Sequence, residues 1–253
     1  IRSDIFYSEP DKDIDIYALL ADYKYNPNAQ NEILAGVKTT LINSDNTFLF
    51  KKNGAVDTQR SNNFYYEEKN LEAYAQYTHS WNKIELSAGL RMEYMHTYNR
   101  LKSQTNQDSE TNKQSHFRLF PNLSASYTIN EKSKIALLYS RRQDKPRYED
   151  LNPFEYLLDE LTYWKGNPFL EPQISNKIML SYALGNLSLN LYYNKLNDYF
   201  TPITDVYGEN KTVMTTKNIG KQQQIGLDAI FSKRVASWWQ FSANAGLYYF
   251  MNK

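Results

Sequence analysis

Ile-Glu-Leu-Ser-Ala-Gly-Leu-Arg-Met-Glu-Tyr-Met-His, residues 84–96, alternates between apolar and polar side chains along nearly its whole length. The apolar set is Ile84, Leu86, Ala88, Leu90, Met92 and Tyr94, and the polar set is Glu85, Ser87, Arg91 and Glu93. Successive side chains of a β-strand point to opposite faces. The stretch therefore predicts a strand with one apolar face and one polar face.

The same two-sided pattern recurs along the whole chain. We expect strands near residues 15–25, 32–43, 64–80, 83–100, 115–129, 133–143, 173–184, 187–203, 211–232 and 239–251. The apolar sets of these strands carry no charge, whereas the opposite sets contain Glu, Lys, Arg and Asn. A Lys or Arg that faces lipid at mid-depth costs roughly 2–4 kcal/mol, so a bilayer imposes this exclusion. The pattern predicts an all-β fold, an antiparallel up-and-down transmembrane β-barrel.

The composition agrees with a strand-built membrane wall. The 253 residues are 41% hydrophobic and include 22 tyrosines, whose apolar ring and polar hydroxyl suit a membrane interface. The mean hydropathy of −0.70 and the lack of any apolar run of about 18 residues exclude helical spans. A barrel needs no such run, because only every second residue of a strand meets lipid.

Charge and cysteine content exclude other classes. The 29 basic and 28 acidic residues give a net charge of +1 with no basic stripe, so we expect no nucleic-acid partner. The absence of cysteine excludes thiol catalysis, cysteine-bound zinc and disulfides. Residues 1–25 already carry Asp4, Asp11, Asp13 and Asp15, which is unlike a secretory leader, so we expect a mature chain or a fragment.

The predicted connections alternate between short and long. Short turns are expected at residues 26–31, 81–83, 130–133, 185–186 and 235–238, and long connections at 44–63, 101–114 and 141–172, with a shorter link at 207–210. Bacterial barrels have short periplasmic turns and long extracellular loops. Trp81, Trp238 and Trp239 fall at short turns, where an aromatic girdle is expected.

One alternative is a soluble barrel or sandwich whose apolar face points inward, because alternation alone does not say which face is inside. The predicted strands of roughly 12–20 residues are much longer than the usual 5–6, which favours the membrane wall.

The longest connection carries a family resemblance. Residues 141–154 read RRQDKPRYEDLNPF, and residues 166–172 read GNPFLEP. This resembles the wall of TonB-dependent outer-membrane receptors, in which an RRPxYxDLNPF segment followed by GNPxLxP links two mid-barrel strands. The chain departs from that pattern at Lys145-Pro146-Arg147, where the family usually has Arg-Pro-Ser or similar. Four prolines, at 146, 153, 168 and 172, predict an ordered loop without helix.

The resemblance implies a receptor with a 22-strand wall, a plug domain and a TonB-contacting segment. We therefore interpret residues 1–253 as a partial outer-membrane barrel domain without its plug. The implied partners are outer-membrane lipid, the plug, the TonB complex and an extracellular ligand of the iron-chelate, cobalamin or oligosaccharide class. Ten strands closing as a complete small barrel remain an alternative.

Candidate site residues follow from the polar face and from the long connection. Arg91, Glu93 and Arg118 are expected to face the lumen or plug, and Arg142, Tyr148, Asn152 and Trp164 are candidate ligand contacts. We predict no catalytic residues, cofactor or metal site, because His79, His96 and His116 lie on different strands without metal-ligand spacing. The rival functions are a passive porin or adhesin, and a ten-strand outer-membrane enzyme with a carboxylate near His96 or His116.

Overall fold

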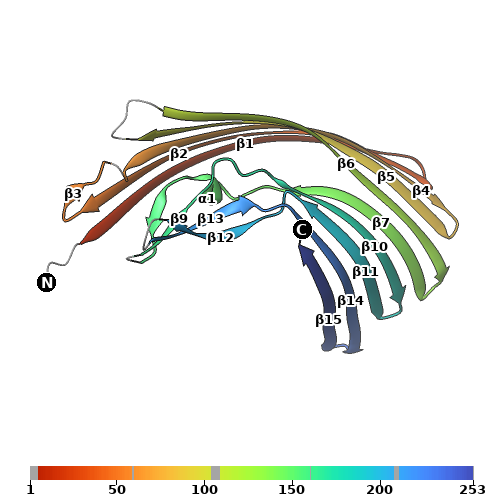
Figure 1. The fold of residues 1–253 in the computed structure, drawn as a ribbon. Coiled ribbons are helices and arrows are strands. Elements are labelled where there is room, and N and C mark those ends of the chain that lie inside the picture. The colour runs from red at the N-terminus through yellow and green to blue at the C-terminus, as the bar shows by residue number, and fades with distance from the viewer. Residues whose placement is uncertain (1–4, 59, 104–108, 160, 208–210, 253) are drawn as a thin grey trace.

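The computed structural model describes residues 5–58, 60–103, 109–159, 161–207 and 211–252. Ten long antiparallel strands form one curved sheet, in which each strand pairs with the next along the path (Figure 1). They are β1 (Phe6–Asn28), β2 (Asn31–Lys52), β4 (Asn62–Trp81), β5 (Ile84–Ser103), β6 (Ser109–Asn130), β7 (Ser133–Asp144), β10 (Gln173–Leu184), β11 (Leu187–Asn197), β14 (Lys221–Ala236) and β15 (Trp239–Asn252). The two-residue β3 (Ala55–Val56) pairs with the end of β2. The ten-strand antiparallel wall predicted from alternation is confirmed.

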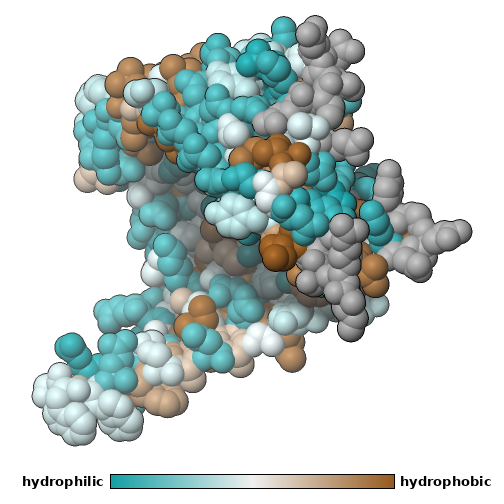
Figure 2. All heavy atoms as spheres, turned by 90° about the vertical axis from the view of Figure 1, so that its left-hand side faces the viewer, coloured by the Kyte–Doolittle hydropathy of each residue, from teal (hydrophilic) through white to brown (hydrophobic). Residues whose placement is uncertain are grey.

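The sheet is an open arc. Among the described residues β1 pairs only with β2 in the path, and β15 only with β14. Figure 2, seen from the left-hand side of Figure 1, shows a hollow partly enclosed by the arc, and hydrophilic residues predominate on the near rim. No helix in the described ranges is long and apolar enough to cross a bilayer.

A belt of apolar side chains runs across the convex face. Successive register positions hold Leu137, Leu180, Leu191, Leu227 and Leu247, on β7, β10, β11, β14 and β15. Their exposed fractions range from 41% to 75%, so they form no core. Such a contiguous apolar surface requires lipid or a partner to cover it. A soluble sandwich would bury this face, and that alternative is therefore wrong.

Tight turns join the strands at one end of the arc (Figure 1). Asn82 and Gly185 have φ values of 50° and 55°, the left-handed conformation that two-residue hairpin turns require. Trp81 and Trp238 are strongly exposed beside two of these turns, and the rings of Trp238 and Trp239 stack at 6.3 Å. The predicted short turns and their aromatic residues are confirmed.

The strands at the opposite end are longer than predicted. β2 continues to Lys52 and β4 begins at Asn62, so most of the expected connection 44–63 is strand. Likewise β5 and β6 take up much of the expected connection 101–114, of which residues 104–108 lie outside the described ranges. The predicted strands stop where the apolar outer face stops. The real strands continue because their inner face becomes apolar there and is covered by other elements.

Two predicted strands are each divided in two. The prediction 187–203 was wrong because β11 ends at Asn197, Asp198 turns with φ of 54°, and β12 (Phe200–Tyr207) follows. The prediction 211–232 was wrong because β13 (Lys211–Asn218) is separated from β14 by Gly220, with φ of 115°. These left-handed residues turn the chain out of the wall. Of the expected link 207–210, residues 208–210 lie outside the described ranges.

The long connection 141–172 is structured. It contains one helical turn, α1 (Tyr148–Leu151), and two short strands, β8 (Glu155–Leu157) and β9 (Thr162–Lys165). The expectation of a loop without helix was wrong at α1, because Pro146 and Pro153 lie outside the turn and leave its hydrogen bonds intact. β8 and β9 join β12 and β13 in a second sheet of order β12-β13-β9-β8, in which β13 and β9 run parallel. In Figure 1 this sheet lies on the concave side of the arc.

Candidate functional site

The described parts of residues 145–172 and 199–219, here called the inserted unit, lie against the concave face of the wall (Figure 1). An aromatic cluster holds the two together. The wall contributes Phe48, Phe50, Phe64 and Tyr66, and the inserted unit contributes Leu151, Phe154 and Leu170. The ring of Phe154 lies 5.3 Å from that of Phe48 and 6.5 Å from that of Phe64. This cluster fixes the inserted unit against β2 and β4.

A buried ionic contact anchors the start of the inserted unit. The Lys145 ammonium lies 2.7 Å from a carboxylate oxygen of Glu68 and 3.5 Å from one of Glu93. Both glutamates are buried, and the Tyr66 hydroxyl donates a hydrogen bond of 2.9 Å to Glu68. Buried carboxylates are tolerated only when they are paired in this way. Lys145 therefore ties the inserted unit to β4 and β5.

The three residues expected to face the lumen lie together on the concave face. Arg91 is 3.0 Å from the carboxylate of Glu72 and 3.7 Å from that of Glu93. Arg118 is the register partner of Glu93 and donates to the Gln143 side chain at 3.3 Å, and Gln143 in turn donates to Glu93. The result is a charged network on β4, β5, β6 and β7.

The four residues predicted to contact ligand are not brought together. Arg142 is exposed on β7. Tyr148 packs on Tyr66 with ring centroids 5.5 Å apart, and burial together with the Glu68 carboxylate raises the pKa of Tyr148 to about 12. The side chain of the buried Asn152 accepts the Phe154 N–H at 3.2 Å, and Trp164 lies within β9.

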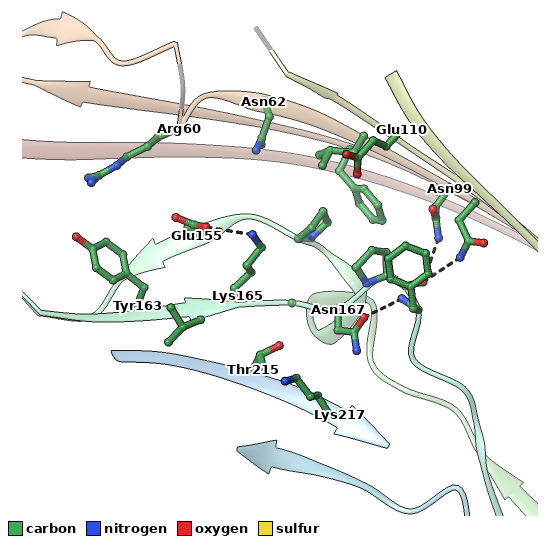
Figure 3. A pocket seen from close by; sticks show the side chains of 18 of the residues that line it. Arg60, Asn62, Asn99, Glu110, Glu155, Tyr163, Lys165, Asn167, Thr215 and Lys217 are labelled. Carbon is green, nitrogen blue, oxygen red and sulfur yellow. Dashed lines mark hydrogen bonds and ion pairs between the residues drawn. The ribbon is translucent and has the colours of Figure 1, made fainter. Parts of the chain in front are cut away.

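A cavity lies between the wall and the inserted unit (Figure 3). This cavity has a volume of about 690 Å³, within the range typical of small-molecule sites. β4, β5 and β6 contribute one side, with Asn62, Asn99 and Glu110, and the inserted unit contributes the other, with Tyr163, Phe169 and Thr215. None of the four predicted ligand residues lines it.

Phe169 is held rigidly at this cavity. The preceding carbonyl, of Pro168, accepts hydrogen bonds from the side-chain amides of Asn99 at 3.3 Å and Asn112 at 3.5 Å. The Asn167 side chain accepts the Phe169 N–H at 3.0 Å and donates to the Thr216 carbonyl at 3.2 Å. The Phe169 side chain nevertheless remains 63% exposed. An exposed aromatic residue on a fixed backbone is typical of a binding contact.

β6 and β7 stop pairing partway along their length. Their pairing ends at Asn122 and Ser140, beside Pro121, which has no N–H to donate to a neighbouring strand. β6 nevertheless continues to Ser109, and the Asn112 amide contacts the inserted unit there. Pro121 therefore lies where the pairing of β6 with β7 ends, and beyond it β6 contacts the inserted unit instead.

Charged groups around the cavity are largely paired with one another. Lys165 lies 3.1 Å from Glu155, and Lys217 lies 2.6 Å from Asp205. The Arg60 guanidinium is 3.8 Å from Asp57 and also covers aromatic rings. In contrast, the Asn62 side-chain oxygen is buried and has no hydrogen-bond partner in the described part of the chain.

Sequence reasoning missed Phe169 and its supporting asparagines. The Gly-Asn-Pro-Phe stretch at 166–169 contributes to the family resemblance and, through Pro168, to the predicted ordered loop, but nothing in it marks Phe169 as a binding contact. Asn99 and Asn112 gave no signal, because they lie far from Phe169 in the sequence and on strands whose ends were predicted as loop.

The histidines do not form a site. His96 contacts the Ser115 hydroxyl at 2.8 Å on the convex face, whereas His116 contacts Gln114 at 3.4 Å and lies on the concave face by strand alternation. Within the described ranges no group of three or more His, Asp or Glu side chains could hold a metal ion.

Comparison with known proteins identifies related folds. The family model described as "Outer membrane protein beta-barrel family" matches residues 1–253. Comparison with curated protein sequences gives no match. Among solved structures, the chain is similar to the ferric yersiniabactin uptake receptor FyuA from Yersinia pestis, with a TM-score of 0.66 and 13% identity over 99% of this chain and 37% of that one.

Two further solved structures are similar at the same level. The copper transporter OprC matches with a TM-score of 0.67 and 12% identity, over 98% of this chain and 39% of OprC. The Serratia marcescens hemophore receptor HasR matches with a TM-score of 0.63 and 13% identity, over 99% of this chain and 44% of HasR. The chain thus spans less than half the length of each of these proteins, and at these identities the likeness concerns the fold.

Proposed function

Because the chain belongs to the outer membrane β-barrel family, we propose that it forms part of the wall of a TonB-dependent receptor that takes up a nutrient. One observation carries the proposal: a ten-strand wall with an apolar outer belt also holds a folded unit on its concave side. The same fold extends over 98–99% of the chain in FyuA, OprC and HasR, whose names describe uptake, transport and hemophore binding. We therefore assign it to transport rather than catalysis.

We propose that further strands complete the wall and that a plug domain fills it. The outer edges of β1 and β15 carry backbone groups that no strand pairs in the described ranges. An unpaired strand edge is very unfavourable in a bilayer, where no water can satisfy it. In this arrangement Arg91, Glu93 and Arg118 line the lumen and support the plug, and Arg142 is a ligand contact on the lumen side.

Energy-dependent uptake tests the proposal. The full-length protein is expressed in an outer membrane lacking its native copy, and uptake of labelled candidate nutrients is followed with and without a functional TonB. We expect accumulation against a gradient that disappears when TonB is deleted or the proton-motive force is collapsed. Uptake that persists under both conditions identifies a passive channel, and chemical conversion of the nutrient at the cell surface identifies an enzyme.

A further inference from the structure

We propose that the 690 Å³ cavity between the wall and the inserted unit binds a neutral oligosaccharide, with Phe169 packing against the face of a sugar ring. This inference rests on the proposed uptake function and names the ligand class of the receptor. It draws on three properties of the cavity: a fixed aromatic side chain, two lysine–carboxylate pairs in the lining, and uncharged polar side chains around the space.

The aromatic contact is prepared in advance. Hydrogen bonds from β5 and β6 hold the Pro168 carbonyl, and Asn167 holds the Phe169 N–H, so the ring projects from a fixed turn. A preorganised contact loses little conformational entropy on binding. Sugar rings present C–H groups on one face and hydroxyls around the edge, so they can pack on an aromatic ring while keeping their polar groups free for hydrogen bonds.

Two lysine–carboxylate pairs in the lining favour an uncharged ligand. Lys165 and Lys217 are paired with Glu155 and Asp205, and Lys211 lies 5.6 Å from the centre of the Tyr163 ring. An anionic metal chelate would have to compete with Glu155 and Asp205 for the ammonium groups of Lys165 and Lys217, or bring its charge close to these carboxylates and to Glu110. Either course incurs repulsion or desolvation that a neutral ligand avoids.

The polar side chains around the cavity favour a ligand that both donates and accepts hydrogen bonds. The Asn62 side chain points into the cavity from the wall in Figure 3, with its amide nitrogen toward the open space. Glu110 and Thr215 lie on opposite sides of the same space and add an acceptor and a hydroxyl. A sugar hydroxyl can donate and accept at once, so it can accept from the Asn62 amide and donate to a neighbouring carboxylate or hydroxyl oxygen.

Calorimetry on the full-length protein tests the assignment. The probes are maltohexaose, cellohexaose, xylohexaose and mannohexaose, with a ferric tris-catecholate as the anionic competitor. We expect at least one oligosaccharide to bind, with an affinity at least tenfold weaker in Phe169→Ala and within threefold of the original in Phe169→Tyr, which keeps the ring. Phe117→Ala is the matched control, because Phe117 is equally exposed but lies on the convex face, and it should leave the affinity unchanged.

Three outcomes of the binding experiment overturn the inference. Binding of the ferric chelate alone, or of none of the four oligosaccharides, refutes the ligand class. Oligosaccharide binding that Phe169→Ala leaves unchanged refutes the site, provided that the variant keeps the heat-modifiable gel mobility of a folded barrel. Failure of the proposed uptake function gives a different result from failure of the binding inference. In that case the oligosaccharide still binds and Phe169→Ala still weakens the binding, but uptake does not depend on TonB.

Discussion

Replacing Leu191 with arginine probes which face of the wall touches lipid. Leu191 lies in β11 between Leu180 and Leu227 of the neighbouring strands, in the middle of the apolar belt. It is four residues beyond Leu187, where β11 begins after its turn. At a rise of about 3.3 Å per residue and a tilt of about 40°, it lies roughly 10 Å above the turn, close to the middle of an apolar band about 25 Å tall.

An arginine at this depth should cost about 2–4 kcal/mol of folding free energy. That corresponds to a loss of roughly 30- to 1,000-fold in the folding equilibrium constant. The measurement is reversible folding of the full-length protein into lipid vesicles, titrated with guanidinium chloride and followed by tryptophan fluorescence. The Leu191→Arg variant should unfold at a lower denaturant concentration with an unchanged slope.

The adjacent residue provides the control. Asn190 faces the concave side and is the register partner of Asp228, so Asn190→Arg places its charge beside a carboxylate and away from lipid. We expect that variant to change stability by no more than about 0.5 kcal/mol. An equal loss in both variants would refute the assignment of the convex face to lipid.

Three further substitutions test the inserted unit. Lys145→Ala leaves the buried Glu68 carboxylate without its cation and should destabilise the unit by about 1–3 kcal/mol, seen as faster limited proteolysis within residues 145–172, whereas Lys145→Arg should be protected. Gly166→Ala would drive its Cβ into the backbone of Asn152 and should cost about 1–3 kcal/mol, seen as earlier thermal release of the unit; unchanged release would contradict this packing. Burial raises the pKa of Tyr148 to about 12 because it disfavours the phenolate, so the stability that neutral Tyr148 contributes is complete below about pH 10 and is lost as the pH rises toward 12. In a titration at 295 nm the original protein should show a phenolate step near pH 12 that Tyr148→Phe lacks, and loss of a step near pH 10 instead would contradict the burial.

The wall could be predicted from the sequence because its two faces, one toward lipid and one toward the lumen, require apolar and polar residues to alternate along each strand. Every second residue from Ile84 to Tyr94 is apolar, and the structure places this set on the convex face. The period carries no information about which sheet a strand joins. β11 and β12 therefore read as one strand, and only the left-handed Asp198 separates them.

The inserted unit and its cavity could not be predicted because they depend on contacts between distant segments. Phe48 falls in the connection expected at 44–63 and Phe64 begins the strand expected at 64–80, and the pattern gives no sign that both pack inward in a cluster with Phe154. Alternation assigns Arg91 and Glu93 to the polar face, but it gives no means of finding Lys145, the cation supplied by the inserted unit.

The aromatic cluster also sets an order of assembly. Phe48 belongs to β2 and Phe154 follows β7, so all of β4 to β7 lies between them along the chain. Joining such distant segments carries a large loop-closure entropy until the intervening hairpins have formed. Wall hairpins should therefore form first and the inserted unit should dock last, so that a nascent barrel passes through a stage with uncovered phenylalanines inside it.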